Sequence, residues 1–433
     1  DSVGKSKFKV IPMHHEQAAS IAAYSYGRTI NSTGICLVTS GPGATNAITG
    51  VAAAYMDSTP MIVISGQVST LFSKKNMKIR QLGFQEFDII SSVKSTTKYA
   101  KFLKNKNQVQ YELDKACFLA KNGRPGPVWL DIPLDIQNSQ VEIKKGKKFF
   151  FNKTISARLN PDVNDKIVNS VTQKLKKAKR PLILFGHGVF LSGAKLDARK
   201  IINKYKIPCQ TTWNSIDLIP EKNDFYFGRA NSYGPRYPNF IIQNSDYILS
   251  IGARLGVQHT GYNVKAFGRN AFLDMVDVDV NESKKPGLKI NRFIKADAKK
   301  FIHKLNHKLE LNRFNQKYPD WIKYCKNIKN KYPVAPEYNS IKQSKYVDPY
   351  YFVKILSAKL RDDETVALGA SGSCFTVSGQ VFSPKKNQRV FTAKGMASMG
   401  FGLPSTIGAS LSKNNKRAIT IIGDGGFQLN VQE

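Results

Sequence analysis

The stretch IPMHHEQAASIAAYSYGRTINSTGICLVTSGPGATNAITGVAAAYMDSTPMIVISGQ, residues 11–67, decides the fold of the first part of this chain. An apolar run at 35–40 leads into the glycine-rich turn GPGATN, an alanine-rich helix follows, and a second apolar run occupies 61–66. This order predicts a parallel α/β unit. Glu16 opens a helix predicted before the first strand, so a carboxylate lies close to a turn where glycine lets a ligand approach the backbone. A lone Glu in a first helical turn can alternatively serve only the helix dipole.

A second set of glycine-rich motifs lies at the far end of the sequence. KGMASMGFGLPSTIGASL, residues 394–411, precedes an apolar strand predicted at 418–422, which leads to Asp424 in the turn GDGG. Parallel α/β folds bind ligands outside the carboxyl ends of their strands. An aspartate there can supply an oxygen ligand to Mg²⁺, and the free backbone N–H groups of Gly425 and Gly426 can hold a phosphate. A plain Asp-Gly turn is the alternative.

Together these motifs resemble those of the thiamine-diphosphate enzymes, in particular the acetolactate synthase (acetohydroxyacid synthase) large-subunit group and its sugar-locus relatives. The motifs stand in the family's order over essentially the whole chain: HEQAA, TSGPGATN, FQE, GRPGPVWLDIP, GMASMGFGLP and GDGGFQLNVQE. The resemblance implies an α/β fold of three doubly wound parallel-sheet domains. We expect a pyrimidine-binding domain at 1–140, a linker at 141–162, a central domain at 163–310, a linker at 311–347 and a diphosphate-binding domain at 348–433.

The resemblance assigns roles to residues of the first domain. Glu16 would hydrogen-bond N1′ of the cofactor's aminopyrimidine and favour the imino tautomer that removes the thiazolium C2 proton. A buried carboxyl suits this role, because desolvation raises its pKa. Pro42 and Asn46 would line the same pyrimidine pocket, and Gln85 would contact the substrate. Glu86, beside it, can simply cap the next element.

The third domain would hold the rest of the cofactor. Met399 would form the wedge that bends thiamine diphosphate, and the Ala397 carbonyl would accept the 4′-amino group. Asp424 would bind Mg²⁺. The diphosphate would lie against Gly372, Ser373, Cys374, Gly423, Gly425 and Gly426. The alternatives are a core methionine at 399 and an ordinary small-residue turn at 372–374.

The resemblance also implies partners. The pyrimidine and diphosphate halves of the family's site come from different subunits, so we expect a homodimer or homotetramer with active sites at the subunit interface. The family's second metal ligand would fall beyond residue 433, and a further helix and strand would precede residue 1. We therefore expect the sequence to be incomplete at both ends.

The central domain is where acetolactate synthases hold FAD. The corresponding segments here are GRANSYGPRYPN and GARLGVQHTGYN, starting at Gly228 and Gly252. Arg254 with Gly228, Gly234 and Gly261 would then serve the dinucleotide's phosphates. The alternative is a flavin-free domain that only supports the dimer.

The composition of the whole chain limits which other classes of protein it could belong to. The formal charge of +35 makes nucleic-acid binding the obvious rival. However, the lysines are spread over linkers and predicted helix faces without a helix-turn-helix, RNA-recognition or zinc-finger pattern, so we predict no specific nucleic-acid partner. The five cysteines show no CxxC spacing, which favours reduced thiols and a cytoplasmic setting. No apolar run is long enough to span a membrane.

The sequence thus predicts a thiamine-diphosphate-dependent carboligase. It would decarboxylate pyruvate and transfer the two-carbon unit to a second 2-oxo acid. One alternative keeps the donor chemistry and uses a nucleotide-linked keto-sugar as acceptor for surface polysaccharide. An alternative of another class is an inactive cofactor-binding paralogue or scaffold.

Overall fold

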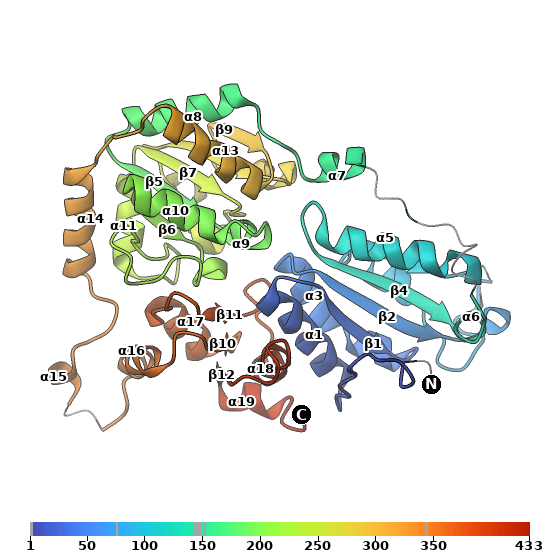
Figure 1. Cartoon of the computed structure of the whole chain (residues 1–433). Helices are drawn as coiled ribbons and strands as arrows, with labels where there is room; N and C mark the ends of the chain where they lie inside the picture. The colour runs from blue at the N-terminus through green and yellow to red at the C-terminus, as the bar shows by residue number, and fades with distance from the viewer. Residues whose placement is uncertain (1–2, 75–76, 142–148, 150–152, 343–344) are drawn as a thin grey trace.

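Three α/β units make up the computed structural model, which describes residues 3–74, 77–141, 149, 153–342 and 345–433 (Figure 1). Each unit contains one sheet whose paired strands are all parallel, with helices packed around it. The predicted three-domain α/β class is therefore confirmed. Of the linker expected at 141–162, residues 142–148 and 150–152 lie outside the described residues. Within the described part, no helix is long and apolar enough to cross a membrane.

The N-terminal domain holds a four-stranded sheet in the order β1-β2-β4-β3. Its strands are β1 (Gly34–Val38), β2 (Met61–Gln67), β3 (Tyr99–Phe102) and β4 (Pro127–Pro133). Its helices are α1 (Glu16–Ile30), α2 (Pro42–Asn46), α3 (Ile48–Met56), α4 (Ile89–Val93), α5 (Val109–Lys121) and α6 (Leu134–Gln137).

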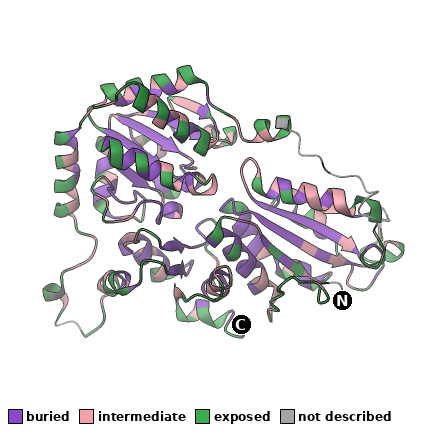
Figure 2. Ribbon diagram, in the orientation of Figure 1, coloured by how far each residue is buried: buried purple, intermediate pink, exposed green. Residues whose placement is uncertain are grey.

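The inner strands β2 and β4 are mostly buried, which explains why they are nearly continuous apolar runs, whereas the edge strand β1 exposes Ile35 and Leu37. On one face Ile62, Val128 and Leu130 pack with Ala116 of α5. On the other, Trp129 packs with residues of α1 and α3. Figure 2 shows the resulting layer of buried strands between partly exposed helices.

The central domain holds a five-stranded sheet in the order β6-β5-β7-β8-β9. Its strands are β5 (Pro181–Phe185), β6 (Cys209–Thr211), β7 (Tyr247–Ile251), β8 (Phe272–Asp277) and β9 (Arg292–Lys295). The accompanying helices are α7 (Lys153–Leu159), α8 (Asp165–Lys177), α9 (His187–Leu191), α10 (Lys195–Tyr205), α11 (Arg236–Asn244), α12 (Val257–Thr260), α13 (Ala298–Leu311) and α14 (Pro319–Lys331).

Helix α14 falls in the segment 311–347 that we expected to be a linker. Its Trp321 and Cys325 are buried in the central core, and Trp321 Nε1 donates to the Pro181 carbonyl at 2.9 Å. This part of the segment therefore packs as an element of the central domain. The short helix α15 (Tyr338–Ile341) follows.

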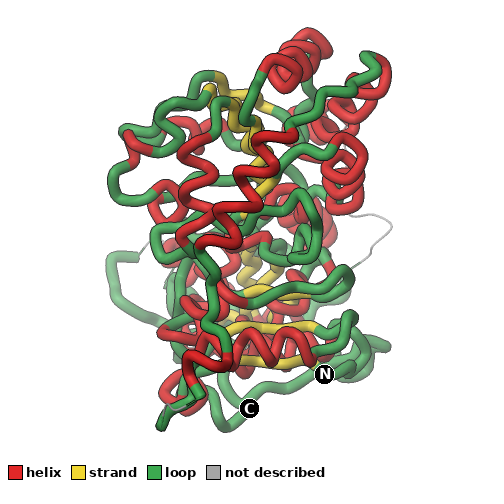
Figure 3. Tube along the Cα trace, turned by 90° about the vertical axis from the view of Figure 1, so that its left-hand side faces the viewer, coloured by secondary structure: helices red, strands yellow, loops and turns green. Residues whose placement is uncertain are grey.

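The C-terminal domain holds a three-stranded sheet in the order β11-β10-β12. Its strands are β10 (Thr365–Leu368), β11 (Arg389–Phe391) and β12 (Ala418–Ile421), and its helices are α16 (Pro349–Lys359), α17 (Gly372–Val381), α18 (Gly402–Leu411) and α19 (Asp424–Gln428). Both chain ends lie on the side of the molecule away from the central domain (Figure 3).

The N- and C-terminal domains pack through α1 and α18. A Cβ built on Gly408 would lie only 2.1 Å from the Ala22 carbonyl oxygen, so the two helix backbones approach as closely as glycine allows. Ser25 donates to Ser405 at 2.8 Å, and the rings of Tyr24 and Phe401 meet edge to face. The two domains consequently share one apolar core.

Asp57 lies where all three domains meet. Its side chain is fully buried, and its carboxylate forms an ion pair with Arg28 at 3.3 Å. It also accepts hydrogen bonds from Asn214 of the central domain at 2.9 Å and from the backbone N–H groups of Lys394 and Gly395 at 3.1 and 3.2 Å. One carboxylate therefore ties together segments more than 300 residues apart.

Replacing Asp57 with alanine should lower stability by about 3–5 kcal/mol, because Arg28 would be left as an uncompensated buried charge. Asp57→Asn, which keeps an acceptor, should cost less. The control is Asp363→Ala, which removes exposed pairs with Arg361 and Lys416 and should change stability by less than about 1 kcal/mol. Chemical denaturation of the three variants measures the difference; equal loss in Asp57→Ala and Asp363→Ala would contradict a structural role for the Asp57 carboxylate.

Candidate active site

Glu16 lies at the first position of α1, beside the turn that follows β1. Its Oε2 accepts a hydrogen bond from the Asn46 side-chain amide at 3.1 Å, and a Cβ built on Gly43 would come within 3.2 Å of its Oε1. Pro42 is the first residue of α2, on the same turn. Burial, and then the nearby Glu16 charge, raise the pKa of the Cys36 thiol to about 12, so this thiol stays protonated. The structure therefore brings together Glu16, Pro42 and Asn46, with Glu16 half-buried in the single chain.

Gln85 faces this turn from a separate loop. Its backbone is left-handed, with φ 59°, and its carbonyl oxygen would lie 2.7 Å from a Cβ built on Gly41, which itself has φ 58°. Only glycine at position 41 leaves room for that approach. The loop bearing Gln85 therefore packs directly on the turn that carries Pro42.

Glu86 holds the loop in shape rather than capping the next helix, which has Asp88 as its N-cap. The Glu86 carboxylate accepts backbone N–H groups of Lys74 at 2.6 Å and Leu82 at 2.9 Å. Burial opposes ionisation here, but these hydrogen bonds outweigh it and lower the pKa of Glu86. Its carboxylate thus stays charged and fixes the loop that presents Gln85.

The second candidate region forms where the strands of the C-terminal sheet end. In the order β11-β10-β12, β11 lies on one side of β10 and the next strand, β12, lies on the other. The crevice between β10 and β12 is therefore the switch point, where open parallel sheets bind ligands. Gly369 after β10 donates to the Ile421 carbonyl of β12 at 2.8 Å. The segments 370–374 and 422–426 therefore lie at one edge of the sheet.

This edge has the features of an anion site. Gly372 opens the ten-residue helix α17 with φ 61°, and Cβ atoms built on Gly372 and Gly423 would meet nothing within 4 Å. Ser373 in the first turn of α17 is exposed, and the Cys374 thiol is turned inward, donating to the Ser371 carbonyl at 2.6 Å. The first N–H groups of a helix are free to hold a phosphate, so the open space and the free donors coincide.

Met399 and Ala397 lie next to this edge. A Cβ built on Gly425 would come within 3.1 Å of Met399 Cε, so the methionine lies over the GDGG turn, yet Met399 itself is 48% exposed. That exposure argues against the core-methionine alternative. Ala397 is exposed and adopts a left-handed conformation, with φ 53°.

Few side chains near this edge could bind a metal ion. Among the described residues, no three His, Cys, Asp or Glu side chains gather as a metal site. Asp424, exposed at the start of α19, supplies one carboxylate. One carboxylate suits Mg²⁺ only where ligand phosphates and water complete the coordination, so Asp424 fits a metal that arrives with a diphosphate.

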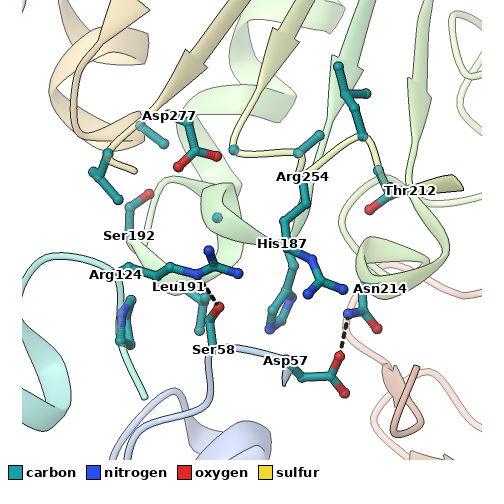
Figure 4. A pocket seen from close by; sticks show the side chains of 18 of the residues that line it. Asp57, Ser58, Arg124, His187, Leu191, Ser192, Thr212, Asn214, Arg254 and Asp277 are labelled. Carbon is teal, nitrogen blue, oxygen red and sulfur yellow. Dashed lines mark hydrogen bonds between the residues drawn. The ribbon is translucent and has the colours of Figure 1, made fainter. Parts of the chain in front are cut away.

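A cavity of about 520 Å³ lies between the three domains (Figure 4). It opens at the ends of β5 and β7, and the order β6-β5-β7-β8-β9 places the switch point of the central sheet between these strands. The backbones there are in close contact, since a Cβ on Gly186 would lie 2.1 Å from the Gly252 carbonyl oxygen. The cavity therefore occupies the position where doubly wound folds bind nucleotides.

Charged side chains from different domains surround the cavity. Arg254, after β7, donates to the Met56 carbonyl at 2.7 Å, and Arg124 from the N-terminal domain donates to Asp279 at 2.9 Å. Burial raises the pKa of Asp277 at the end of β8 to about 6. Burial and the positive charges of neighbouring arginines lower the pKa of His187 well below its usual range, so its ring is neutral.

One of the four residues that the sequence suggested for a dinucleotide site lines this cavity. Arg254, expected to contact a dinucleotide's phosphates, lines the cavity, whereas Gly228, Gly234 and Gly261 are not among its described lining residues. A Cβ on Gly228 would come within 2.4 Å of the Tyr237 hydroxyl, so this glycine serves packing. His187, in the GHG turn after β5, also lines the cavity, opposite the GARLG turn that follows β7.

Comparison with known families accounts for all three domains. Residues 1–92 match "Thiamine pyrophosphate enzyme, N-terminal TPP binding domain", residues 168–305 match the central domain of the same family, and residues 370–433 match its C-terminal TPP binding domain. The acetolactate synthase large subunit of Lactococcus lactis subsp. lactis is 31% identical over 97% of this chain and 70% of its own length. The chain belongs to the thiamine pyrophosphate enzyme family.

Other relatives of this thiamine pyrophosphate enzyme carry the same name. The probable acetolactate synthase large subunit of Methanococcus aeolicus is 31% identical over 97% of this chain and 70% of its own length. Acetolactate synthase isozyme 2 large subunit of Escherichia coli is 30% identical over 97% of this chain and 72% of its own length. Glu16 falls in the matched N-terminal TPP binding domain, and Asp424 in the matched C-terminal one.

Proposed function

We propose that this enzyme is a thiamine-diphosphate-dependent carboligase of the acetolactate synthase type, which decarboxylates pyruvate and joins the two-carbon unit to a second 2-oxo acid. The observation that carries the proposal is the match to acetolactate synthase large subunits at about 30% identity over 97% of the chain, with both TPP binding domains present. The bound cofactor supplies a carbanion nucleophile and stabilises the charge left when CO₂ departs.

Residues of the N-terminal domain bind the cofactor's pyrimidine ring and exchange a proton with it. Glu16 exchanges a proton with a ring nitrogen, and the hydrogen bond from Asn46 fixes the orientation of its carboxylate. Pro42 and Asn46 line the ring, and Gln85, held by the Gly41 contact, faces the substrate. Glu16 is half-buried in the single chain, and a second subunit that covers it would exclude water from the carboxylate.

Residues of the C-terminal domain hold the other end. The backbone N–H groups of Gly372, Ser373 and Cys374, together with those of Gly423, Gly425 and Gly426, bind the diphosphate, and Asp424 binds the Mg²⁺ that accompanies it. Met399, which lies over the GDGG turn, would contact the bound cofactor, and the carbonyl of Ala397 would accept a hydrogen bond from its amino group. The open space above Gly372 and Gly423 supports this assignment.

A second copy of the chain completes the site in this proposal. The loop that carries Gln85 exposes apolar side chains, with Phe84 87% and Leu71 73% exposed. Apolar residues concentrated on one loop beside a half-buried carboxylate are typical of an interface. We propose a homodimer, or a homotetramer built from it, with each site shared between two chains.

The cavity between the domains is the proposed FAD site. Its volume lies within the roughly 300–1,000 Å³ usual for cofactor sites, and the close glycine turns after β5 and β7, together with Arg254, suit a dinucleotide's phosphates.

CO₂ release from labelled pyruvate tests the donor reaction. Release should require both thiamine diphosphate and Mg²⁺, and Glu16→Gln should slow it by about 10²–10⁴-fold while largely keeping cofactor affinity, because only the positioned acid/base group is lost. The control is Glu310→Gln, which changes an exposed partner of Lys204. An unchanged rate in Glu16→Gln would remove Glu16 from the mechanism, and no release from the wild type would refute the pyruvate donor.

Asp424→Ala should weaken binding of Mg²⁺ and diphosphate together, raising the Mg²⁺ concentration needed for half-maximal thiamine diphosphate binding by at least tenfold. Calorimetric titration of the cofactor at several Mg²⁺ concentrations measures this, with the exposed Asp224→Ala as control. Unaltered Mg²⁺ dependence would place the metal elsewhere.

Flavin occupancy has a direct readout. The purified full chain should retain visible flavin absorbance after desalting, or regain it on incubation with FAD. A chain that never acquires flavin would favour the flavin-free alternative.

A further inference from the structure

Lys394 is buried without a partner for its charged end. Its side chain is 8% exposed, and its Nζ makes no hydrogen bond with any described residue. The amine lies 4.1 Å from the centre of the Trp213 ring and 3.7 Å from that of Phe375. Lysine is almost never buried this far without a partner, because an unpaired amine in the interior loses its hydration.

The charges around Lys394 do not supply that partner. Burial lowers the pKa of Lys394 well below its usual range, Asp57 offsets part of the effect, and Arg229 and Arg28 lower the pKa further. Asp57 is already engaged by Arg28, Asn214 and the backbone of Lys394 itself. The aromatic rings favour a cation, but only weakly compared with full burial. In the single chain burial therefore favours the neutral form of the amine.

Lys394 also lines the cavity between the domains, together with Trp213, Asp57 and Gly395. Its backbone is fixed, since its N–H and that of Gly395 both donate to Asp57. A buried amine with unused donors, on a fixed backbone beside a cavity that also contains Arg254, meets the requirements of an anion-recognition group.

We propose that Lys394 recognises a negatively charged oxygen of the nucleotide that occupies this cavity, and that it takes up a proton when the nucleotide binds. This inference rests on the proposed nucleotide occupancy but does not require that the nucleotide be a flavin. Binding then weakens as pH rises, by up to about tenfold per pH unit for one proton, because burial favours the neutral amine in the free protein and the bound anion favours the charged one.

Isothermal titration of FAD, FMN, ADP and pyrophosphate into the purified full chain tests this, in two buffers of different ionisation enthalpy. At least one of these anions should bind the wild type with proton uptake. Lys394→Met, which keeps the length and apolar stem, should weaken that anion by at least tenfold and abolish the uptake. Lys121→Met changes an exposed lysine on the same cavity and should alter affinity by less than about threefold.

Lys394→Arg separates recognition from a structural role. Arginine stays charged, so this variant should recover much of the anion affinity but show no proton uptake. Equal affinity and equal uptake in the wild type and Lys394→Met would overturn the proposal, as would failure of all four anions to bind the wild type. If ADP binding depends on Lys394 while flavin never binds, the FAD proposal fails and this one stands; if FAD binds the wild type and Lys394→Met alike, the reverse holds.

Discussion

The buried carboxylate of Asp57 is the interaction on which the arrangement of the three domains depends. It neutralises Arg28 of α1, accepts the Asn214 amide of the central domain, and accepts two backbone N–H groups that open the segment carrying Ala397 and Met399. A buried charge is tolerated only when it is paired and hydrogen-bonded, and here the partners come from every domain. One group thus helps to hold both the lining of the cavity and the segment that carries Ala397 and Met399.

A second constraint is topological. The central and C-terminal sheets both begin with a strand that ends up in the interior of the sheet, so each has a switch point between its first and third strands. Loops diverge at such points and leave a crevice at the strand ends. One crevice becomes the cavity beside Arg254, and the other becomes the edge where Gly372 and Asp424 meet. The two proposed cofactor positions therefore follow from the same winding rule.

Much of this arrangement was predictable from local sequence. The apolar runs at 35–40, 61–66 and 418–422 became β1, β2 and β12 within two residues. Burial explains the apolar run of the inner strand β2, whereas the edge strands β1 and β12 are only partly buried. The Glu16 and Asn46 contact was also foreseeable, since α1 leads into β1 and packs against it, which places the start of the helix near the turn that follows the strand. The glycines at 228, 234 and 261 were less informative, because a packing glycine and a phosphate-binding glycine look the same in sequence.

The sequence by itself determined the main strands, the parallel sheets and the family, because apolar periodicity, glycine turns and ordered motifs are local properties. Only the tertiary structure decided which charges lose their water. In the sequence, Lys394 is one of many lysines in a basic chain, but in the structure it is buried between Trp213 and Phe375. Asp57 looks like an ordinary loop residue in the sequence, but its side chain is fully buried. Burial and charge pairing depend on segments far apart in the chain meeting in space, so no local pattern encodes them.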